Sequence, residues 1–134
     1  MSENQNRAPS GAYTTVKTIL VVEDDRSIAS FFVEAIKQET PHQALFAFDG
    51  QRALIMLHDL KPDLIVLDYS LPYMNGLELY DHIHAMKGLE HIPALVISAR
   101  PPFEEAQKRK LMCLKKPIAL DELLQTIEKL LTQE

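Results

Sequence analysis

Four short apolar runs in this sequence are each followed at once by side chains that could do chemistry. Two runs are followed by carboxylates, one by a hydroxyl and one by amines, in the order Glu23-Asp24-Asp25, Asp68, Ser98 and Lys115-Lys116. If these runs are parallel strands, their carboxyl ends meet at one edge of a sheet and the groups converge in one pocket. Carboxylates that close together repel one another and raise each other's pKa values. A hard divalent cation such as Mg²⁺ resolves this conflict, because it binds carboxylates and keeps waters that phosphate oxygens can replace.

Five apolar runs of four residues indicate the strands of that sheet. They cover residues 19–22, 45–48, 64–67, 94–97 and 111–114. None of the runs alternates with polar residues. Continuous apolar runs of this length are typical of strands that are buried on both faces, as in a parallel sheet.

Segments with helical periodicity lie between the runs. The first carries an apolar stripe of five residues, Ile28, Phe31, Phe32, Ala35 and Ile36. Three further helices are predicted to open at or close to Gly50, Gly76 and Leu120. The fourth connection, residues 100–110, begins with two prolines after Arg100 and predicts a helix of two turns at most. Strands and helices that alternate in this way predict a three-layer α/β fold with right-handed crossovers.

Length and composition favour one ordinary soluble domain. The chain has 134 residues, of which 46% are hydrophobic and 25% are charged, and this fits one globular domain. The net charge of −5 argues against a dedicated nucleic-acid binder, and the single cysteine, Cys113, excludes an internal disulfide. No apolar run approaches the ~18 residues of a membrane span, so we expect a cytoplasmic protein. Residues 1–16 are polar and aperiodic, and we expect them to form a flexible tail before a domain at residues 17–134.

The order of these motifs resembles the receiver domain of two-component response regulators, whose single-domain members are the chemotaxis receivers. The motifs are ILVVEDD at 19–25, PDLIVLDYSLPYMNG at 62–76, ALVISA at 94–99 and Lys116-Pro117. Pro72 and Gly76 also stand at the family's offsets from Asp68, and the resemblance runs from about residue 17 to residue 131. It implies a single doubly wound, flavodoxin-like (βα)5 domain with a five-stranded parallel sheet in the order 2-1-3-4-5.

The resemblance implies a role for each acidic residue. Asp68 would be the phosphoacceptor, whose carboxylate attacks a phosphoryl group in line and becomes an acyl phosphate. Asp24 would bind Mg²⁺ (or Mn²⁺) directly, and Glu23 would act on the ion through water. Asp68 and the backbone carbonyl of Ser70 would complete the metal shell. Asp25 would instead cap the first helix.

The resemblance also assigns the amine and the hydroxyl. Lys116 would pair with a phosphoryl oxygen and supply positive charge where negative charge accumulates. The Lys116-Pro117 peptide bond is expected to be cis, and Lys115 is expected to be solvated. Ser98 would be the switch hydroxyl, which moves to hydrogen-bond the phosphoryl group.

Two features depart from the family pattern. Cys113 stands where the family usually has an aromatic ring that swings inward on activation, and a thiol cannot act as that plug. The stretch from Ser98 to Lys116 is about four residues shorter than usual, so the fourth helix is expected to be shortened. That helix belongs to the family's dimer and output face, so a homodimer through this face is not expected. The basic cluster at 108–110 is expected to be solvated or to dock a protein, and the histidines are expected at the solvated surface.

We therefore interpret the chain as a phosphorylation-dependent signalling switch. A phosphohistidine on a sensor histidine kinase or a histidine phosphotransfer protein would donate to Asp68, and the modified domain would change its affinity for a downstream protein partner or output domain. It would catalyse its own phosphorylation and dephosphorylation without being a turnover enzyme. No direct binding to nucleic acid or to a membrane is expected.

Two other classes of protein are alternatives to this interpretation. Cys113 and the shortened fourth helix motivate a receiver-like interaction module that does not switch. Such a module would have no reason to keep the acids, Ser98 and Lys116 together. A nucleotide-binding flavodoxin-like protein is disfavoured, because no glycine-rich phosphate loop follows the first strand.

Overall fold

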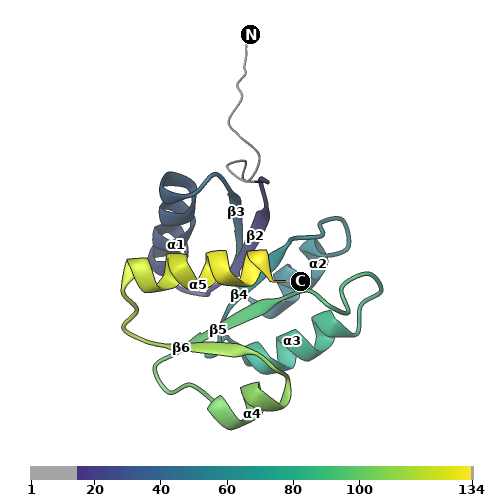
Figure 1. Cartoon of the computed structure of the whole chain (residues 1–134). Helices are drawn as coiled ribbons and strands as arrows, with labels where there is room; N and C mark the ends of the chain where they lie inside the picture. The colour runs from purple at the N-terminus through teal and green to yellow at the C-terminus, as the bar shows by residue number, and fades with distance from the viewer. Residues whose placement is uncertain (1–14, 134) are drawn as a thin grey trace.

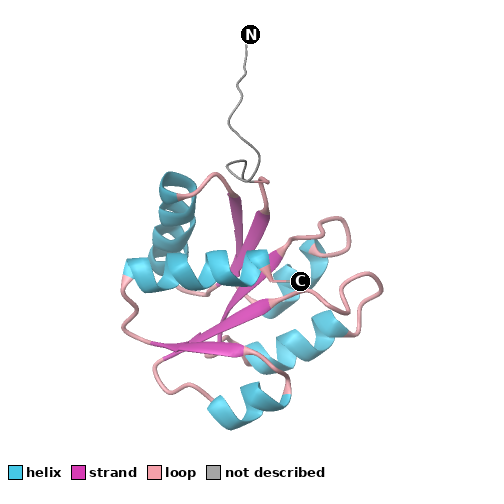
Figure 2. Ribbon diagram, viewed as in Figure 1, coloured by secondary structure: helices cyan, strands magenta, loops and turns pink. Residues whose placement is uncertain are grey.

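Five strands and five helices alternate along residues 15–133, the part of the chain that the computed structural model describes (Figure 2). The strands are β2 (Thr18–Val22), β3 (Gln43–Ala47), β4 (Leu64–Asp68), β5 (Ala94–Ser98) and β6 (Met112–Lys115). The helices are α1 (Arg26–Glu39), α2 (Gly50–Met56), α3 (Gly76–His84), α4 (Phe103–Lys108) and α5 (Leu120–Thr132). Of the tail expected at residues 1–16, residues 1–14 lie outside the described range.

All five strands form one parallel sheet in the order β3-β2-β4-β5-β6. Counted along the chain, this is the expected order 2-1-3-4-5. The three central strands are buried along nearly their whole length, as continuous apolar runs predict for strands that helices cover on both faces.

The edge strand β3 is less buried than the sequence predicts. Leu45 is 42% exposed and Phe46 is 38% exposed. A strand at the edge of a sheet has a neighbour on one side only, so apolar residues do not guarantee burial there. The strand also begins two residues before the predicted run, at Gln43. β6, at the opposite edge, is shifted by one residue from the predicted run at 111–114.

Helices cover both faces of the sheet, so the domain has three layers (Figure 1). α1 and α5 pack on one face through Phe32, Val33, Ile36, Leu123, Ile127 and Leu130. α2 and α3 pack on the other face through Ala53, Leu79, Tyr80 and Ile83. Within residues 15–133, no helix combines the length and the apolar character that crossing a bilayer requires.

Three helices begin at side-chain caps beside the carboxyl edge of the sheet. Asp25 accepts a hydrogen bond from the Ile28 amide at 3.0 Å, which confirms it as the cap of α1. The Asp49 carboxylate accepts from the Arg52 amide at 2.7 Å and starts α2. Asn75 and Glu78 form a reciprocal capping box that starts α3. These caps fix the points at which the chain leaves the site and enters each helix.

One residue of the stripe predicted for α1 lies outside the core. Phe31 is 55% exposed, whereas Phe32 and Ile36 are buried. Successive residues on a helix are turned by about 100°, so Phe31 points away from the face that Phe32 buries. The predicted stripe was therefore too wide.

Helix α4 is short, as expected, and an ion pair ties its carboxyl end to α3. It has six residues, which is less than two turns. The Arg109 guanidinium donates to both carboxylate oxygens of Asp81, at 2.8 and 2.7 Å. This bidentate pair holds the pKa of Asp81 below its usual value. The middle residue of the basic cluster at 108–110 is therefore engaged in a structural contact.

His42 is buried, contrary to the expectation that the histidines lie at the solvated surface. It is only 4% exposed, and its Nδ1 atom accepts a hydrogen bond from the Lys17 amide at 3.1 Å. The ring thus supplies an acceptor to the backbone just before β2. A partly buried amide is stabilised by such a partner, and only the folded chain brings it there.

Gly76 allows α3 to begin against the backbone of the phosphoacceptor candidate. A Cβ atom at Gly76 would lie 2.7 Å from the Asp68 carbonyl oxygen, whereas one at Gly50 would meet the flexible Met74 side chain at 2.8 Å. We expect Gly76→Ala to lower the free energy of unfolding by about 1–3 kcal/mol, because backbone must shift to make room. Gly50→Ala should change it by less than about 1 kcal/mol, since Met74 can move. Urea denaturation of the two variants decides this, and equal stabilities would contradict the packing argument.

Candidate functional site

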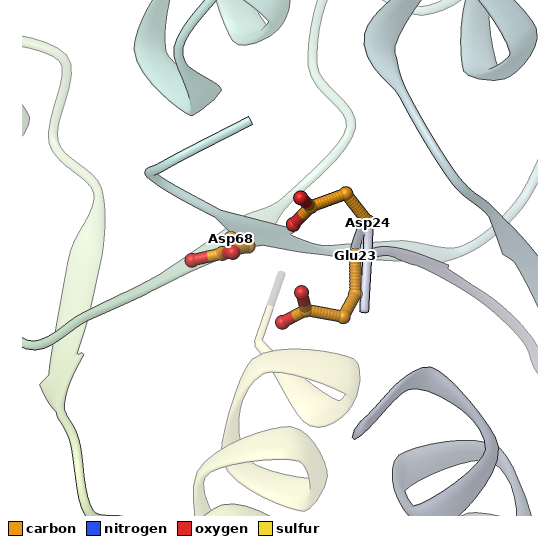
Figure 3. A group of neighbouring side chains, drawn as sticks. All are labelled: Glu23, Asp24 and Asp68. Carbon is orange, nitrogen blue, oxygen red and sulfur yellow. The ribbon is translucent and has the colours of Figure 1, made fainter. Parts of the chain in front are cut away.

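Three carboxylates meet at the carboxyl edge of the sheet. Glu23 and Asp24 follow β2, and Asp68 ends the neighbouring strand β4. Each offers an oxygen atom, and these three atoms all lie within 4.8 Å of one another (Figure 3). Glu23 is 2% exposed and Asp68 is 6% exposed, whereas Asp24 is exposed to solvent. The predicted convergence of these acids is therefore observed, with one accessible acid above two buried ones.

Lys116 adds one positive charge to the cluster. Its Nζ atom lies 3.3 Å from Asp68 Oδ1 and 3.8 Å from Glu23 Oε1. The Lys116 amide donates to the Ser98 carbonyl oxygen at 2.9 Å, which fixes the chain just beyond β6. The Lys116-Pro117 bond is cis, as expected, and Lys115 is exposed to solvent. Of the two neighbouring lysines, only Lys116 thus reaches the acids.

Backbone amides complete the contacts of the two buried acids. The Asp25 amide donates to Glu23 Oε2 at 3.0 Å, and the Ser70 amide donates to Asp68 Oδ1 at a longer 3.4 Å. The other Glu23 oxygen, Oε1, is buried without a hydrogen-bond partner among the described residues. A buried charged oxygen without a partner is costly.

The charge balance of the cluster is negative. The pKa of Glu23 is raised to about 7. Burial is the largest cause of the rise, and the Asp68 carboxylate adds to it. The Asp25 amide and Lys116 act in the opposite direction. One ammonium therefore does not neutralise three acids. A cation with oxygen ligands fits this donor set, because it would offset the repulsion and its bound water could donate to the buried Glu23 oxygen.

Ser98 and Ser70 sit beside the cluster in different ways. Ser98 ends β5, is 4% exposed, and its Oγ atom accepts a hydrogen bond from the Arg100 amide at 3.0 Å. Its hydroxyl proton is not used in that bond. Ser70 is exposed and meets Asp68 through its amide. The role expected of the Ser70 carbonyl stays a prediction.

Sequence reasoning missed the backbone amides of the site. The amides of Asp25 and Ser70 hold the acids, yet every residue except proline carries such a group. Their contribution depends on the path of the loop, for which the residue types carry no signal. The side chains themselves were all located by their position after an apolar run.

Cys113 lies on the edge strand β6, where it is half-buried and aligned with Val96 of β5. Burial raises the pKa of its thiol. A thiol in that state is protonated at neutral pH and is a poor nucleophile. The residue therefore behaves as a small packing group.

This fold and this set of side chains define a class of signalling domain. A doubly wound parallel sheet carries acids, a serine and a lysine at the edge where such sheets bind ligands. The sequence model of the family described as response regulator receiver domain matches residues 19–128. The chain belongs to this family, and it is a receiver domain of two-component signalling systems.

Proteins similar in sequence include a sensor histidine kinase and a response regulator. The chain is 30% identical over 122 residues to sensor histidine kinase TmoS of Ectopseudomonas mendocina, an alignment that covers 87% of this chain and 12% of that protein. It is 34% identical over 87 residues to DNA-binding response regulator MtrA of Mycolicibacterium smegmatis, covering 65% of this chain and 36% of that protein. The chain thus spans only a small part of the length of these relatives.

Solved structures share the fold. Chemotaxis response regulator CheY4 of Vibrio cholerae superposes with a TM-score of 0.80 at 23% identity, covering 87% of this chain and 99% of that one. NtrX of Brucella abortus superposes with a TM-score of 0.77 at 30% identity, covering 87% of this chain and 27% of that one. The first likeness supports the fold alone, because its sequence identity is low.

The raised pKa of Glu23 predicts a pH-dependent cost to folding in the absence of metal. The Glu23 carboxyl has its ordinary pKa of 4.5 in the unfolded chain and a pKa of about 7 in the folded chain. Ionisation therefore destabilises the fold progressively as the pH rises through this window, and the cost is complete above about 7. In chelator, we expect Glu23→Gln to stabilise the protein by about 1–2 kcal/mol near pH 8, after allowance for solvent screening, and to be nearly neutral near pH 4.5.

Chemical denaturation at the two pH values tests this expectation. Glu34→Gln, at an exposed site on α1, is the matched control. Its effect on the free energy of unfolding should be the same at both pH values. A Glu23→Gln variant that is less stable than the parent near pH 8 would contradict the assigned charge balance.

Proposed function

We propose that this domain is a phosphorylation-dependent switch that accepts a phosphoryl group on Asp68. One observation carries the proposal. The buried Asp68 carboxylate lies 3.3 Å from the Lys116 ammonium and shares its pocket with the oxygens of Glu23 and Asp24. A nucleophilic carboxylate, a cation for the transferred charge and further oxygen ligands are the parts that phosphoryl transfer needs.

In the proposed reaction, an Asp68 carboxylate oxygen attacks phosphorus in line with the leaving group. A P–O bond to Asp68 forms while the P–N bond to the donor histidine breaks. The electron pair of that bond stays with the donor imidazole, which takes a proton from solvent. Lys116 pairs with an oxygen of the transferred group, as its distance to Asp68 allows.

The acids beside Asp68 are the proposed metal ligands. Asp24 and Asp68 would hold Mg²⁺ (or Mn²⁺) directly, together with the Ser70 carbonyl, and Glu23 would act through water. The ion, when bound, supplies positive charge to the phosphoryl oxygens. The unpartnered Glu23 oxygen and the excess of negative charge support this assignment.

Ser98 is the residue that we propose couples phosphorylation of Asp68 to a conformational change. Its Oγ atom accepts from the Arg100 amide, so its hydroxyl proton is free to bond a phosphoryl oxygen on the neighbouring strand. That bond would favour one of two arrangements of the loop after β5 and so change the affinity for a partner. Hydrolysis of the acyl phosphate by water would restore the first arrangement.

The proposed donor is a sensor histidine kinase or a histidine phosphotransfer protein. The proposed recipient is a downstream protein partner or output domain, with no nucleic-acid or membrane contact by this domain itself. A cytoplasmic location and a domain at residues 17–134 that follows a tail at 1–16 belong to the same proposal. Relatives named as a sensor histidine kinase and as a DNA-binding response regulator support it.

The second candidate is a receiver-like interaction module that does not switch. Cys113 on β6 and the six-residue helix α4 favour it, because both alter the surface through which the family transmits its signal. The assembled acidic site argues against it, since burying Glu23 and Asp68 together is costly without a use.

Intact-protein mass spectrometry distinguishes the two candidates. After incubation with Mg²⁺ and acetyl phosphate, we expect one added phosphoryl group on the parent chain, none on Asp68→Asn, and none in chelator. Asp59→Asn, a change at an exposed aspartate, is the matched control and should be phosphorylated like the parent. Lys116→Ala should slow the reaction about 10-fold or more, whereas Lys115→Ala should not.

Two outcomes would contradict the switch. One is an adduct that persists on Asp68→Asn. The other is the absence of an adduct combined with no Mg²⁺-dependent binding of beryllofluoride, a phosphoryl mimic, observed by NMR. The second outcome would favour the module that does not switch.

A further inference from the structure

An apolar groove lies beside the edge strand β3, and no function has been assigned to it so far. Its cavity of about 400 Å³ is lined by Phe46, Ala47, Phe48, Arg52, Ile55 and Met56. We call it the β3–α2 groove, after the elements that provide most of its lining. Ile55 is 63% exposed and Phe46 is 38% exposed. Large apolar side chains exposed together mark sites of association more often than isolated ones do.

The aromatic side of the groove is packed in one arrangement. The rings of Phe46 and Phe48 lie 4.8 Å apart, and the Arg26 guanidinium sits 4.0 Å above the centre of the Phe48 ring. Such contacts hold aromatic side chains in place without a partner. A preformed apolar surface costs little to order on binding.

Two arginine side chains lie next to the apolar lining. Arg52 lines the groove, and Arg26 stacks on its Phe48 ring. Asp49 lies 3.7 Å from Arg52 and offsets part of its charge, but the Arg52 side chain is 63% exposed and can reach a second carboxylate. This local balance contrasts with the net charge of −5 of the whole chain. The surface therefore complements an apolar side chain that is flanked by carboxylates.

We infer that the β3–α2 groove is a docking surface for an amphipathic, acidic helix of a protein partner. One or two apolar residues of that helix enter the groove between Phe46 and Ile55. Carboxylates three or four residues away along the same helix reach Arg26 and Arg52, because that spacing places them on the same face.

The groove borders the acidic site at two points. The Ala47 carbonyl oxygen, at the groove, accepts a hydrogen bond from the Glu23 amide at 3.0 Å. Gly50, the first residue of α2, packs against Met74 in the loop that follows Asp68. A helix docked here would therefore sit beside both loops of the site.

A second copy of the chain is a poorer occupant than a different protein. In α4, Phe103 is 61% exposed and is followed by Glu104 and Glu105. This segment therefore has the exposed apolar side chain and the neighbouring carboxylates that the groove would accept. However, a contact between α4 of one copy and the groove of the next uses two different surfaces. Such head-to-tail contacts generate rings or open filaments. Residues 1–14 of this chain contain a single carboxylate, Glu3, and do not provide an acidic helix face.

A designed peptide tests the inference on the full chain. The probe is a 16-residue helix with leucines on one face and glutamates beside them, and the matched probe carries lysines instead. In ¹⁵N NMR titrations, we expect only the acidic peptide to shift the amides of residues 46–48 and 52–56. Ile55→Asp and Arg52→Glu should each weaken its binding about 10-fold or more.

Phe103→Asp is the matched control, because Phe103 and Ile55 are almost equally exposed. It should leave binding unchanged and should fold like the parent. Equal binding of the two peptides, shifts confined to other surfaces, or no shifts at millimolar peptide would overturn the inference. Concentration-dependent self-association that both Ile55→Asp and Phe103→Asp abolish would assign the groove to a second copy and would also overturn it.

Discussion

The mutual repulsion of Glu23, Asp24 and Asp68 is the constraint on which the rest of this structure depends. Carboxylate oxygens within 4.8 Å of one another are unfavourable, more so when two of the acids are almost fully buried. A single ammonium, two backbone amides and a raised pKa at Glu23 relieve only part of that cost. The domain holds the acids in place because the strands that end at them, β2 and β4, are buried and paired with neighbours over most of their length. The remaining cost is free energy that a bound cation would recover, because it would offset the excess negative charge.

The helices that begin beside the acids are held by side-chain caps, whereas the segment after β5 has fewer such contacts. Caps at Asp25, Asp49 and Asn75 anchor the helices that begin beside the acids, and Gly76 brings α3 against the Asp68 backbone. By contrast, only the short helix α4 separates Ser98 from β6, and no side chain caps that helix. The helices beside the acids are therefore anchored by side-chain caps, whereas the helix that follows β5 is short and has none. The Arg109 to Asp81 ion pair is the contact that a movement of this helix would have to keep or break.

The side chains of the site could be predicted from the sequence more completely than the burial of residues outside it. Placing Asp68, Ser98 and Lys116 in one pocket required only that apolar runs become parallel strands, because strand ends in such sheets share an edge. Burial at Phe31, Phe46 and His42 was not predictable in the same way. It depends on which side of a strand or helix meets a neighbour, and for His42 on a backbone amide that arrives from a distant segment. The contacts of the Asp25 and Ser70 amides could not be predicted from residue types at all, because loop geometry alone sets the direction of a backbone amide.

Thermal unfolding with and without Mg²⁺ tests the central claim, that the acidic cluster is a cation site. At constant ionic strength, Mg²⁺ at 100 times its dissociation constant should stabilise the fold by about 2.7 kcal/mol, which raises Tm by several degrees. Asp24→Asn should unfold at a higher temperature than the parent in chelator, because one repelling charge is gone, and should lose most of the response to Mg²⁺. A parent chain whose Tm is unchanged by Mg²⁺, or an Asp24→Asn variant that responds as strongly as the parent, would contradict the account.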